Sequence, residues 1–591
     1  MYRLSAVQSD PTPDTDIRAP DRSSVPEAAP VMPETAHHKR LPDPAPDPDP
    51  LVRHLRQILM WPLQLMPAGP DAEDLQPWER LERAAQPHPW KELADEFTAD
   101  PVEFQERHYR EFVTFLPHVQ RFLYGQGRAA HGHVGYGESP IRIFRRTDLA
   151  AIRMHFAEGE PLDCAIQHAD LYFFYDIDIV VPVVEIRAEN IPLSRVQEVL
   201  YRFGRASPGG WNPDGSPQAC LLAAEWIGHE GQVLARSDMA DREAYLAFTA
   251  RHRAQNVAAH WRYLLQPLAL HHSDEPGPLR YRQIEYHRMP KLTYIAVDDP
   301  FALSEDRFLR LALAMREEPG ELPFSQATRA ELAASVFYDR FWNPQLREAR
   351  APMRVSCNGA AMTMVGSWND DYFRDAQAGL LGQFRHQYFL VGLIAHFHKA
   401  ALLMLSDRLI TAVSMLDVRD SASQARFRQS IRQTREVFLR FNHRYWFHEV
   451  SNQSMARDLF ERWGRHLGTD ALFHELREEL LDMGGYLDSD DARQQGESVL
   501  RLTVVTILGL VGTIVTGFLG MNLIDAADEP LSYRVLLAAL VTLPVILLTL
   551  ATVRHSRVLA RWLDIVADDQ PMGLRQRWRR LIQSARRPAK P

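Results

Sequence analysis

The residues with the clearest chemical meaning are threonines and glycines in an uncharged segment near the C-terminus, residues 502–524. At about 100° per residue, residues 502–520 separate into two unlike halves of a helix. The residues of the first half, which we call the Thr/Gly face, are mostly small or weakly polar: Thr503, Thr506, Gly509, Gly512, Thr513, Thr516, Gly517 and Gly520. Leu502, Val505 and Leu510 are the bulkier residues on this half. The opposite half is valine, isoleucine, leucine and phenylalanine.

The Thr/Gly face has two interpretations. In a ring of subunits it would form a pore wall, because threonine hydroxyls bind water and glycines leave room for it. Leu502 and Leu510 would then be apolar constrictions that close by dewetting. The alternative is a close-packing face between helices, which uses the same small residues and needs no pore.

The surrounding segments predict two membrane spans. Residues 502–524 and 535–553 contain no charged residue. Each segment is long enough for a hydrocarbon core of about 30 Å. The connection at 525–534 carries Asp525, Asp528 and Glu529, whereas the tail at 555–591 is rich in arginine. The positive-inside bias therefore predicts an outer acidic loop, with both termini in the cytoplasm.

Most of the chain should lie outside the membrane, because hydrophobic residues make up only 46% of it. The net charge of −9 gives no reason to expect nucleic acid as a partner. The three cysteines are far apart in the sequence, which argues against a cysteine zinc site. Residues 1–50 are rich in proline and aspartate, lack a signal peptide and are predicted to be disordered. The sequence contains no P-loop, HExxH, GxSxG or dinucleotide-binding motif, so we expect no enzyme.

The body is predicted to have two parts. Residues 51–370 read as a cytoplasmic α/β domain, with an amphipathic helix at 51–68, helices within 75–125, strands within 141–190 and at 292–297, and a helix at 192–203. Residues 371–500 read as helical. The apolar stretch 388–405 is a rival span, but His396, His398 and Lys399 favour a buried helix of the soluble body.

Residues 471–500 are predicted to form a stalk helix. The sequence places one apolar stripe along it: Leu472, Leu476, Leu480, Met483 and Leu487. The stripe could serve a stalk between subunits or pack on its own subunit, and the spacing alone does not choose between them.

The first span ends in Gly520-Met521-Asn522, at the outer end of the first of two C-terminal spans. In that context the chain resembles the CorA family of magnesium transporters, which carries Gly-Met-Asn at this place. The resemblance is specific over residues 468–560. It implies a homopentamer with a cytoplasmic α/β domain and a stalk helix that continues into a pore-lining first span. It also implies that Gly520, Met521 and Asn522 form an outer selectivity ring, and that Leu502, Leu510 and Thr513 line the pore.

The helical wheel of residues 502–520, drawn at about 100° per residue, adds Thr506, Gly509 and Gly517 to the pore-lining residues. Mg²⁺ loses its water reluctantly, and a ring of asparagine carboxamides can bind the hydrated ion without stripping it. Asp525, Asp528 and Glu529 would concentrate cations at the entrance. On an ideal helix Asn522 would point about 160° away from Thr506, so the helix must break near Gly520.

The sequence also departs from the family pattern. Leu519 stands where the family usually has an aromatic residue, and no Met-Pro-Glu follows the motif. The preference among Mg²⁺, Co²⁺, Ni²⁺ and Zn²⁺ therefore stays open, since a zinc-transporting branch shares Gly-Met-Asn. The acidic residues near the inner mouth are candidate regulatory metal ligands, or simply a solvated acidic turn: Asp488, Asp490, Asp491 and Glu497.

The sequence thus predicts a CorA-like plasma-membrane channel, as in a bacterial inner membrane, that passes divalent cations without nucleotide hydrolysis. The alternatives are a zinc transporter of the same superfamily and a membrane-anchored cytoplasmic scaffold without transport.

Overall fold

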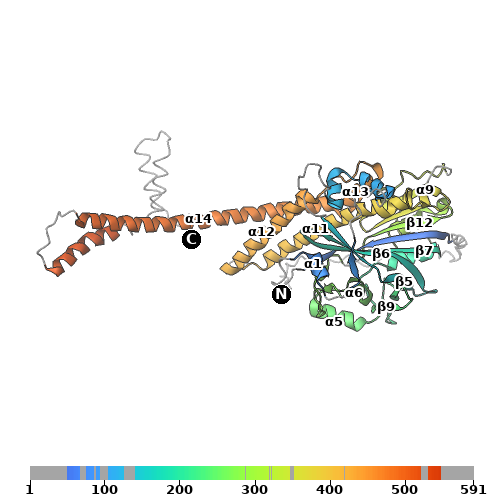
Figure 1. Ribbon diagram of the computed structural model, residues 1–591, viewed down its shortest axis with the longest axis horizontal. Coiled ribbons are helices and arrows are strands. Elements are labelled where there is room, and N and C mark those ends of the chain that lie inside the picture. The colour runs from blue at the N-terminus through green and yellow to red at the C-terminus, as the bar shows by residue number, and fades with distance from the viewer. Residues whose placement is uncertain are drawn as a thin grey trace, which may run out of the picture. The chain divides into compact units, whose positions relative to one another are not determined.

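The fold is built around one mixed sheet of fifteen strands (Figure 1). The computed structural model describes residues 49–66, 75–84, 88–93, 104–125, 140–285, 288–318, 320, 322–346, 352–417, 420–520 and 530–547. The predicted disordered segment up to residue 48, the first half of the outer loop (525–529) and the basic tail lie outside these residues.

The strands follow one main path, β13-β14-β15-β12-β1-β7-β6-β5-β8-β9, with β2, β3, β4, β10 and β11 attached beside it. Their bounds are β1 Leu51–Met60, β2 Leu63–Leu65, β3 Trp90–Glu92, β4 Ile141–Arg146, β5 Leu149–His155, β6 Leu162–Phe174, β7 Ile177–Pro192, β8 Ala223–Gly228, β9 Val233–Arg236, β10 Ala269–Leu270, β11 Arg280–Gln283, β12 Lys291–Val297, β13 Phe337–Tyr338, β14 Met353–Cys357 and β15 Ala361–Ser367. The predicted strands within 141–190 and at 292–297 are confirmed.

The helices before residue 371 are short. Their bounds are α1 Pro77–Glu82, α2 Glu106–Thr114, α3 Pro117–Tyr124, α4 Leu193–Arg202, α5 Arg242–His252, α6 Ala259–Leu265, α7 Glu305–Ala312 and α8 Gln326–Val336, with the 3₁₀ turn η2 Pro300–Ala302. The helix predicted at 192–203 is α4. Beyond residue 370 the structure is helical as predicted: α9 Asp371–Arg374, α10 Leu380–Gln383, the π-helix η3 Phe384–Tyr388, α11 Phe389–Ser414, α12 Ser421–Arg444, α13 Ser454–Leu467 and α14 Thr469–Gly520.

The sheet separates two hydrophobic cores, because successive side chains of a strand point to opposite faces. On β12, Leu292 and Tyr294 enter the core shared with α11 and α13, whereas Ile295 enters the core shared with α4, α6 and α7. Helices therefore cover both faces of the sheet.

The prediction of a helix at 51–68 is wrong. Residues 51–60 form β1, an interior strand paired antiparallel with both β7 and β12. The mixture of polar and apolar residues suggested the polar side of an amphipathic helix, but His54, Arg56 and Gln57 are all buried. Arg56 is accommodated because its guanidinium binds the buried carboxylate of Glu185.

The apolar stretch 388–405 belongs to α11. Among the described residues, one helix is long and apolar enough to cross a membrane, Leu380–Ser414, and 78% of its most apolar window is buried. α11 contacts the sheet through β7 and the helices α12, α13 and α14. Burial lowers the pKa of His396 and of His398 to about 3, so both rings are neutral at neutral pH. Lys399 donates to the carbonyl of Leu467 at the end of α13. The structure therefore places α11 in the protein core.

Candidate functional site

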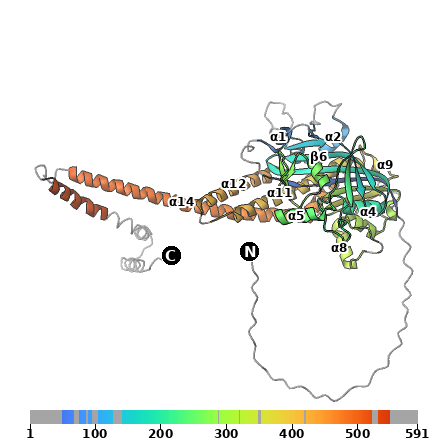
Figure 2. The same cartoon turned by 90° about the horizontal axis from the view of Figure 1, so that it is seen from below.

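The candidate pore residues lie on α14, which runs without interruption from the body into the first predicted span. Its first half packs against α11 and α12 (Figures 1 and 2). Leu476 and Leu480 are buried there, and Leu472 and Met483 pack against the same core. The predicted apolar stripe thus packs on its own chain over this stretch. The side chain of Leu487 lies outside the described residues.

The Thr/Gly face is open along the distal part of α14. Leu502 is 67% exposed and Leu510 is 58% exposed. Thr506, Gly509, Thr513 and Gly517 are exposed as well. A Cβ added to Gly509, Gly512, Gly517 or Gly520 would meet no atom within 4 Å.

The opposite half of the helix is partly covered. Val515 is buried, and Ile507 and Val511 are half-buried. These three positions are four residues apart, so they form one line along the helix. Ile514 on the same half is 53% exposed, so the structure covers one line of this half, and the pore-facing role of the Thr/Gly face stays a prediction.

The threonine hydroxyls on this face donate to the backbone of their own helix. Thr506 donates to the carbonyl of Leu502 at 2.9 Å, and Thr513 donates to that of Gly509 at 3.0 Å. Thr503 and Thr516 do the same toward Val499 and Gly512. A hydroxyl has one donor and two acceptor lone pairs. Each oxygen therefore offers only acceptor capacity to its surroundings.

Several predicted site residues cannot be placed. α14 is described to Gly520, the first residue of Gly-Met-Asn. Met521, Asn522, Asp525, Asp528 and Glu529 lie outside the described residues, so the selectivity ring, the helix break and the acidic entrance stay predictions.

The candidate regulatory acids lie on α14, but their side chains are outside the described part of the chain: Asp488, Asp490, Asp491 and Glu497. Among the residues that are described, no group of three or more His, Cys, Asp or Glu side chains could hold a metal ion.

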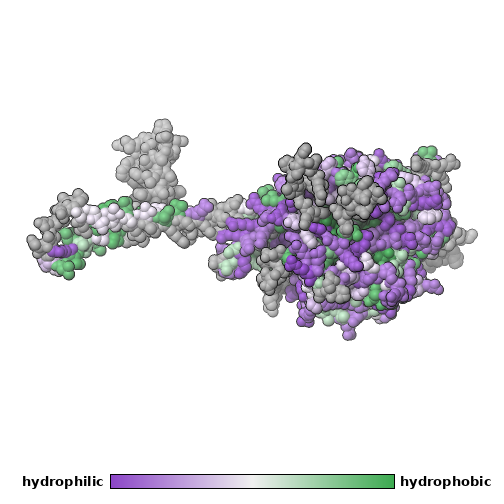
Figure 3. Space-filling model, in the orientation of Figure 1, coloured by the Kyte–Doolittle hydropathy of each residue, from purple (hydrophilic) through white to green (hydrophobic). Residues whose placement is uncertain are grey.

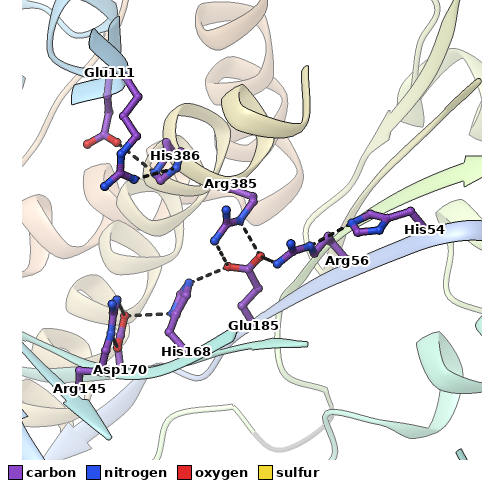
Figure 4. Close-up of polar contacts among 10 residues, drawn as sticks. His54, Arg56, Glu111, Arg145, His168, Asp170, Glu185, Arg385 and His386 are labelled. Atoms are coloured by element: carbon purple, nitrogen blue, oxygen red, sulfur yellow. Dashed lines mark hydrogen bonds and ion pairs between the residues drawn. The ribbon is translucent and has the colours of Figure 1, made fainter. Parts of the chain in front are cut away.

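A buried ionic network in the sheet was missed by sequence reasoning (Figure 4). Glu185 on β7 is its centre and is fully buried. Its Oε1 accepts from Arg56 Nη1 and from Arg385 Nε, each at 2.8 Å. Its Oε2 lies 2.7 Å from Nε2 of His168 on β6.

The network continues to a second buried carboxylate. Nδ1 of His168 lies 3.0 Å from Oδ2 of Asp170. Arg145 on β4 donates to both oxygens of Asp170, at 2.7 and 2.8 Å. Arg385 belongs to η3, so the network joins the sheet to the start of α11.

Protonation in the network follows from opposing effects. Burial disfavours the imidazolium of His168, but the bonds to Asp170 and Glu185 outweigh it and raise its pKa to about 9. Burial also works against the Glu185 carboxylate, yet His168, Arg385 and Arg56 hold its pKa well below the usual range. At neutral pH, therefore, His168 is charged and both carboxylates are ionised.

Two acidic residues at and beside the β6–β7 turn also form ion pairs. Asp176 lies 3.1 Å from Arg440 and 3.6 Å from Arg444, both on α12. Asp178 forms an ion pair with Arg408 on α11. They fasten the β6–β7 turn to the helices.

Comparison with known proteins agrees with the sequence motif. Residues 411–554 match the family model described as "CorA-like Mg2+ transporter protein". No curated protein matches the chain. Two solved structures show low similarity, each with a TM-score of 0.18. The full-length CmaX protein is 16% identical, with 45% of this chain and 89% of that chain covered. The CorA magnesium transporter from Methanocaldococcus jannaschii is 15% identical, with 47% and 95% covered.

The resemblance to the CorA family is therefore confirmed for a CorA-like Mg²⁺ transporter domain at residues 411–554. This segment contains α12, α13, all of α14 and both predicted spans. The large sheet lies before it.

Proposed function

We propose that the chain forms a CorA-like homo-oligomeric channel, a pentamer by resemblance, that passes hydrated Mg²⁺ across the plasma membrane without nucleotide hydrolysis. The main support for the proposal is the exposed Thr/Gly face on the distal half of α14, a helix whose first half packs against the body. This face lies within the segment that matches the CorA-like family model.

The exposed apolar surface supports a membrane location. Figure 3 shows hydrophobic side chains over the distal part of α14 and over the helix Leu531–Leu547. Ten large aliphatic side chains there are between 41% and 77% exposed: Leu502, Leu510, Ile514, Leu531, Val535, Leu536, Leu540, Leu543, Ile546 and Leu547. Fully burying one such side chain is worth about 1.5–3 kcal/mol. Covering all ten is therefore worth on the order of 10 kcal/mol, which a bilayer and neighbouring subunits would supply.

The threonines fit a hydrated cation as the cargo. Water molecules around Mg²⁺ turn their hydrogens outward, and Mg²⁺ keeps its water tightly. Thr506 and Thr513 have committed their protons to backbone carbonyls, so their oxygens would accept from that water shell. An anion would meet no hydroxyl donor on this face.

Two leucine rings would control the pathway. Leu502 and Leu510 are two helical turns apart, about 12 Å along α14. In a ring of subunits, each would place a collar of aliphatic side chains around the axis and would close it by dewetting. Gly509 and Gly517 leave wider, wettable sections next to these collars.

The outer end would select the ion. We propose that Gly520, Met521 and Asn522 form the selectivity ring, with Asn522 carboxamides facing the hydrated ion. Asp525, Asp528 and Glu529 would raise the cation concentration at this mouth. Both termini and the sheet domain would lie in the cytoplasm.

The test is uptake of Mg²⁺ into liposomes that carry the purified full-length chain, compared with the variant Asn522→Ala. The matched control is Asn452→Ala, the same substitution at an exposed position before α13. We expect wild-type and control protein to take up Mg²⁺ and Asn522→Ala to lose most of the uptake.

Parallel assays with Zn²⁺, Co²⁺ and Ni²⁺ would give the ion preference. Folded, oligomeric wild-type protein that moves none of the four ions would refute the channel and leave a membrane-anchored scaffold as the better account.

A further inference from the structure

A cleft of about 260 Å³ lies between α2, the α10–η3 segment and the start of α13. None of the candidate pore residues on α14 lines it. Most of its lining residues are polar, with Val113, Ala378 and Gly382 among the rest, and four of them can carry charge: Arg107, Arg110, Glu111 and His386. Four further lining residues are glutamines.

The cleft has an excess of positive charge. The two arginines and Glu111 give the lining residues a net charge of +1, and Glu106, the partner of Arg110, lies outside the lining. Glu111 is already engaged, because Tyr124 donates to its Oε1 at 2.7 Å and Nδ1 of His386 lies 3.4 Å from its Oε2. Its carboxylate therefore orients the imidazole ring, whose Nε2 lies 3.4 Å from Nη1 of Arg107.

Arg110 can reach a ligand at little cost. It forms an ion pair with Glu106, one turn away on the same helix, and the two side chains are 44% and 77% exposed. Such exposed pairs contribute only about 0.3–0.5 kcal/mol. A ligand that offers two oxygens to the guanidinium would displace Glu106, because bidentate charge-assisted bonds are stronger.

Neutral donors complete the lining. The side chains of Gln377 and Gln453 border the cleft, and Gln453 is the N-cap residue of α13 without a side-chain capping bond. The first N–H groups of a helix favour negative charge. The start of α13 therefore adds to the field of the two arginines.

The frame of the cleft is rigid. Gly382 lies in its wall, and a Cβ there would be only 2.8 Å from the carbonyl oxygen of Ala376. The adjoining π-helix η3 sends two consecutive side chains to different places. Arg385 turns toward Glu185 in the sheet, and His386 turns toward Glu111 at the cleft (Figure 4). π-helical turns are frequent at functional sites.

We propose that this cleft binds a small molecule through an oxyanion group, a phosphate or a carboxylate. Two guanidinium groups exclude a metal cation as the ligand, and amide donors with arginines suit oxygen acceptors. The volume lies just below the usual range of about 300–1,000 Å³ for ligand sites. The occupant is therefore of the size of inorganic phosphate, a small phosphomonoester or a small dicarboxylate.

The experiment is calorimetric titration of the purified full-length chain with inorganic phosphate, at constant ionic strength set by sodium chloride. The cleft variants are Arg110→Gln and Arg107→Gln. The matched control is Arg426→Gln on α12, whose side chain is 73% exposed and lies outside the cleft. We expect one saturable site, weakened about tenfold or more by each cleft variant, as for the loss of one charge-assisted hydrogen bond. The control should bind as wild type does.

Sulfate and citrate titrations separate the two sources of the oxyanion. Tighter phosphate binding assigns a phosphate, and tighter citrate binding assigns a carboxylate. Wild-type protein that binds none of the three, or affinity that survives Arg110→Gln, overturns the proposal. Because Arg110 is exposed, Arg110→Gln should fold normally. It therefore tests phosphate binding by the cleft even if Arg107→Gln lowers the melting temperature. The titration requires no transport, so its failure leaves the channel proposal untouched.

Discussion

Replacing Glu185 with glutamine should destabilise the sheet domain more than any surface substitution of the same kind. The carboxylate is fully buried and binds two arginines and one histidine. Glutamine has nearly the same shape but no charge, and its amide N–H₂ would face these donors. Arg56, whose side chain is only 7% exposed, would then lack its carboxylate.

The expected cost can be worked from these contacts. Removing one partner of a buried ion pair costs about 3–5 kcal/mol, because the other charge stays buried and unpaired. Two features reduce this free-energy cost. Arg385 is 23% exposed and can gain water, and His168 can release its proton. We therefore expect about 3 kcal/mol, the lower end of that range.

The assay is thermal and urea unfolding of the purified chain in detergent, followed by circular dichroism. A loss of about 3 kcal/mol corresponds to a melting temperature lowered by about 4–5 °C, because the unfolding entropy of a domain spanning residues 51–370 is about 0.7 kcal/mol per kelvin. The control is Glu189→Gln on the same strand, where the side chain is 51% exposed and its ion pairs are long. That variant should lose less than about 1 kcal/mol. Equal stability of the two variants would refute the idea that the buried network holds β7 to the start of α11.

Two further predictions concern the same network and the pore. The unfolding free energy of the wild type should fall as the pH rises from 6.5 toward 9, because folded His168, with a pKa of about 9, keeps a proton that the unfolded chain releases at about 6.5. The slope of the unfolding free energy against pH approaches about 1.4 kcal/mol per pH unit. Urea unfolding midpoints at pH 6.5, 7.5 and 8.5 measure this slope. The same slope in the variant His168→Gln would contradict the assignment of the pH dependence to His168. At the second of the two proposed leucine constrictions, Leu510→Ser should raise resting Mg²⁺ leakage into liposomes severalfold by wetting the collar. Val511→Ser, on the half opposite the Thr/Gly face, should leave the leakage unchanged. Equal leakage through both variants would argue against a leucine gate.

Much of the membrane-proximal part could be predicted because its signals are local. The Thr/Gly face depends only on helical periodicity, and the structure has residues 502–520 within the single helix α14. The burial of α11 could be predicted as well, because Lys399 and two histidines in an apolar helix suit a protein interior better than a bilayer. In each case the residues that carry the signal are close in sequence.

The interior of the sheet could not be predicted in the same way. β1 contains His54, Arg56 and Gln57, which on their own are typical of a solvent-facing side. Their burial depends on Glu185, which is 129 positions from Arg56 in the chain. Arg385 is a further 200 positions from Glu185. A pattern within one segment cannot reveal a charge balanced by residues so far away.

The same network explains how the sheet can fix the direction of the candidate pore helix. Arg385 fastens the start of α11 to β7, and the buried length of α11 then contacts α12, α13 and α14. The first half of α14 is thereby held through Leu476 and Leu480, whereas the distal half exposes its leucines. Because α14 is held at one end only, other surfaces must cover the exposed leucines of its distal half. Repetition of the same chain around an axis would bring the distal halves together with their Thr/Gly faces inward and leave the aliphatic half to the second helix and to lipid. The position of the sheet domain would then set the tilt of every helix in the ring.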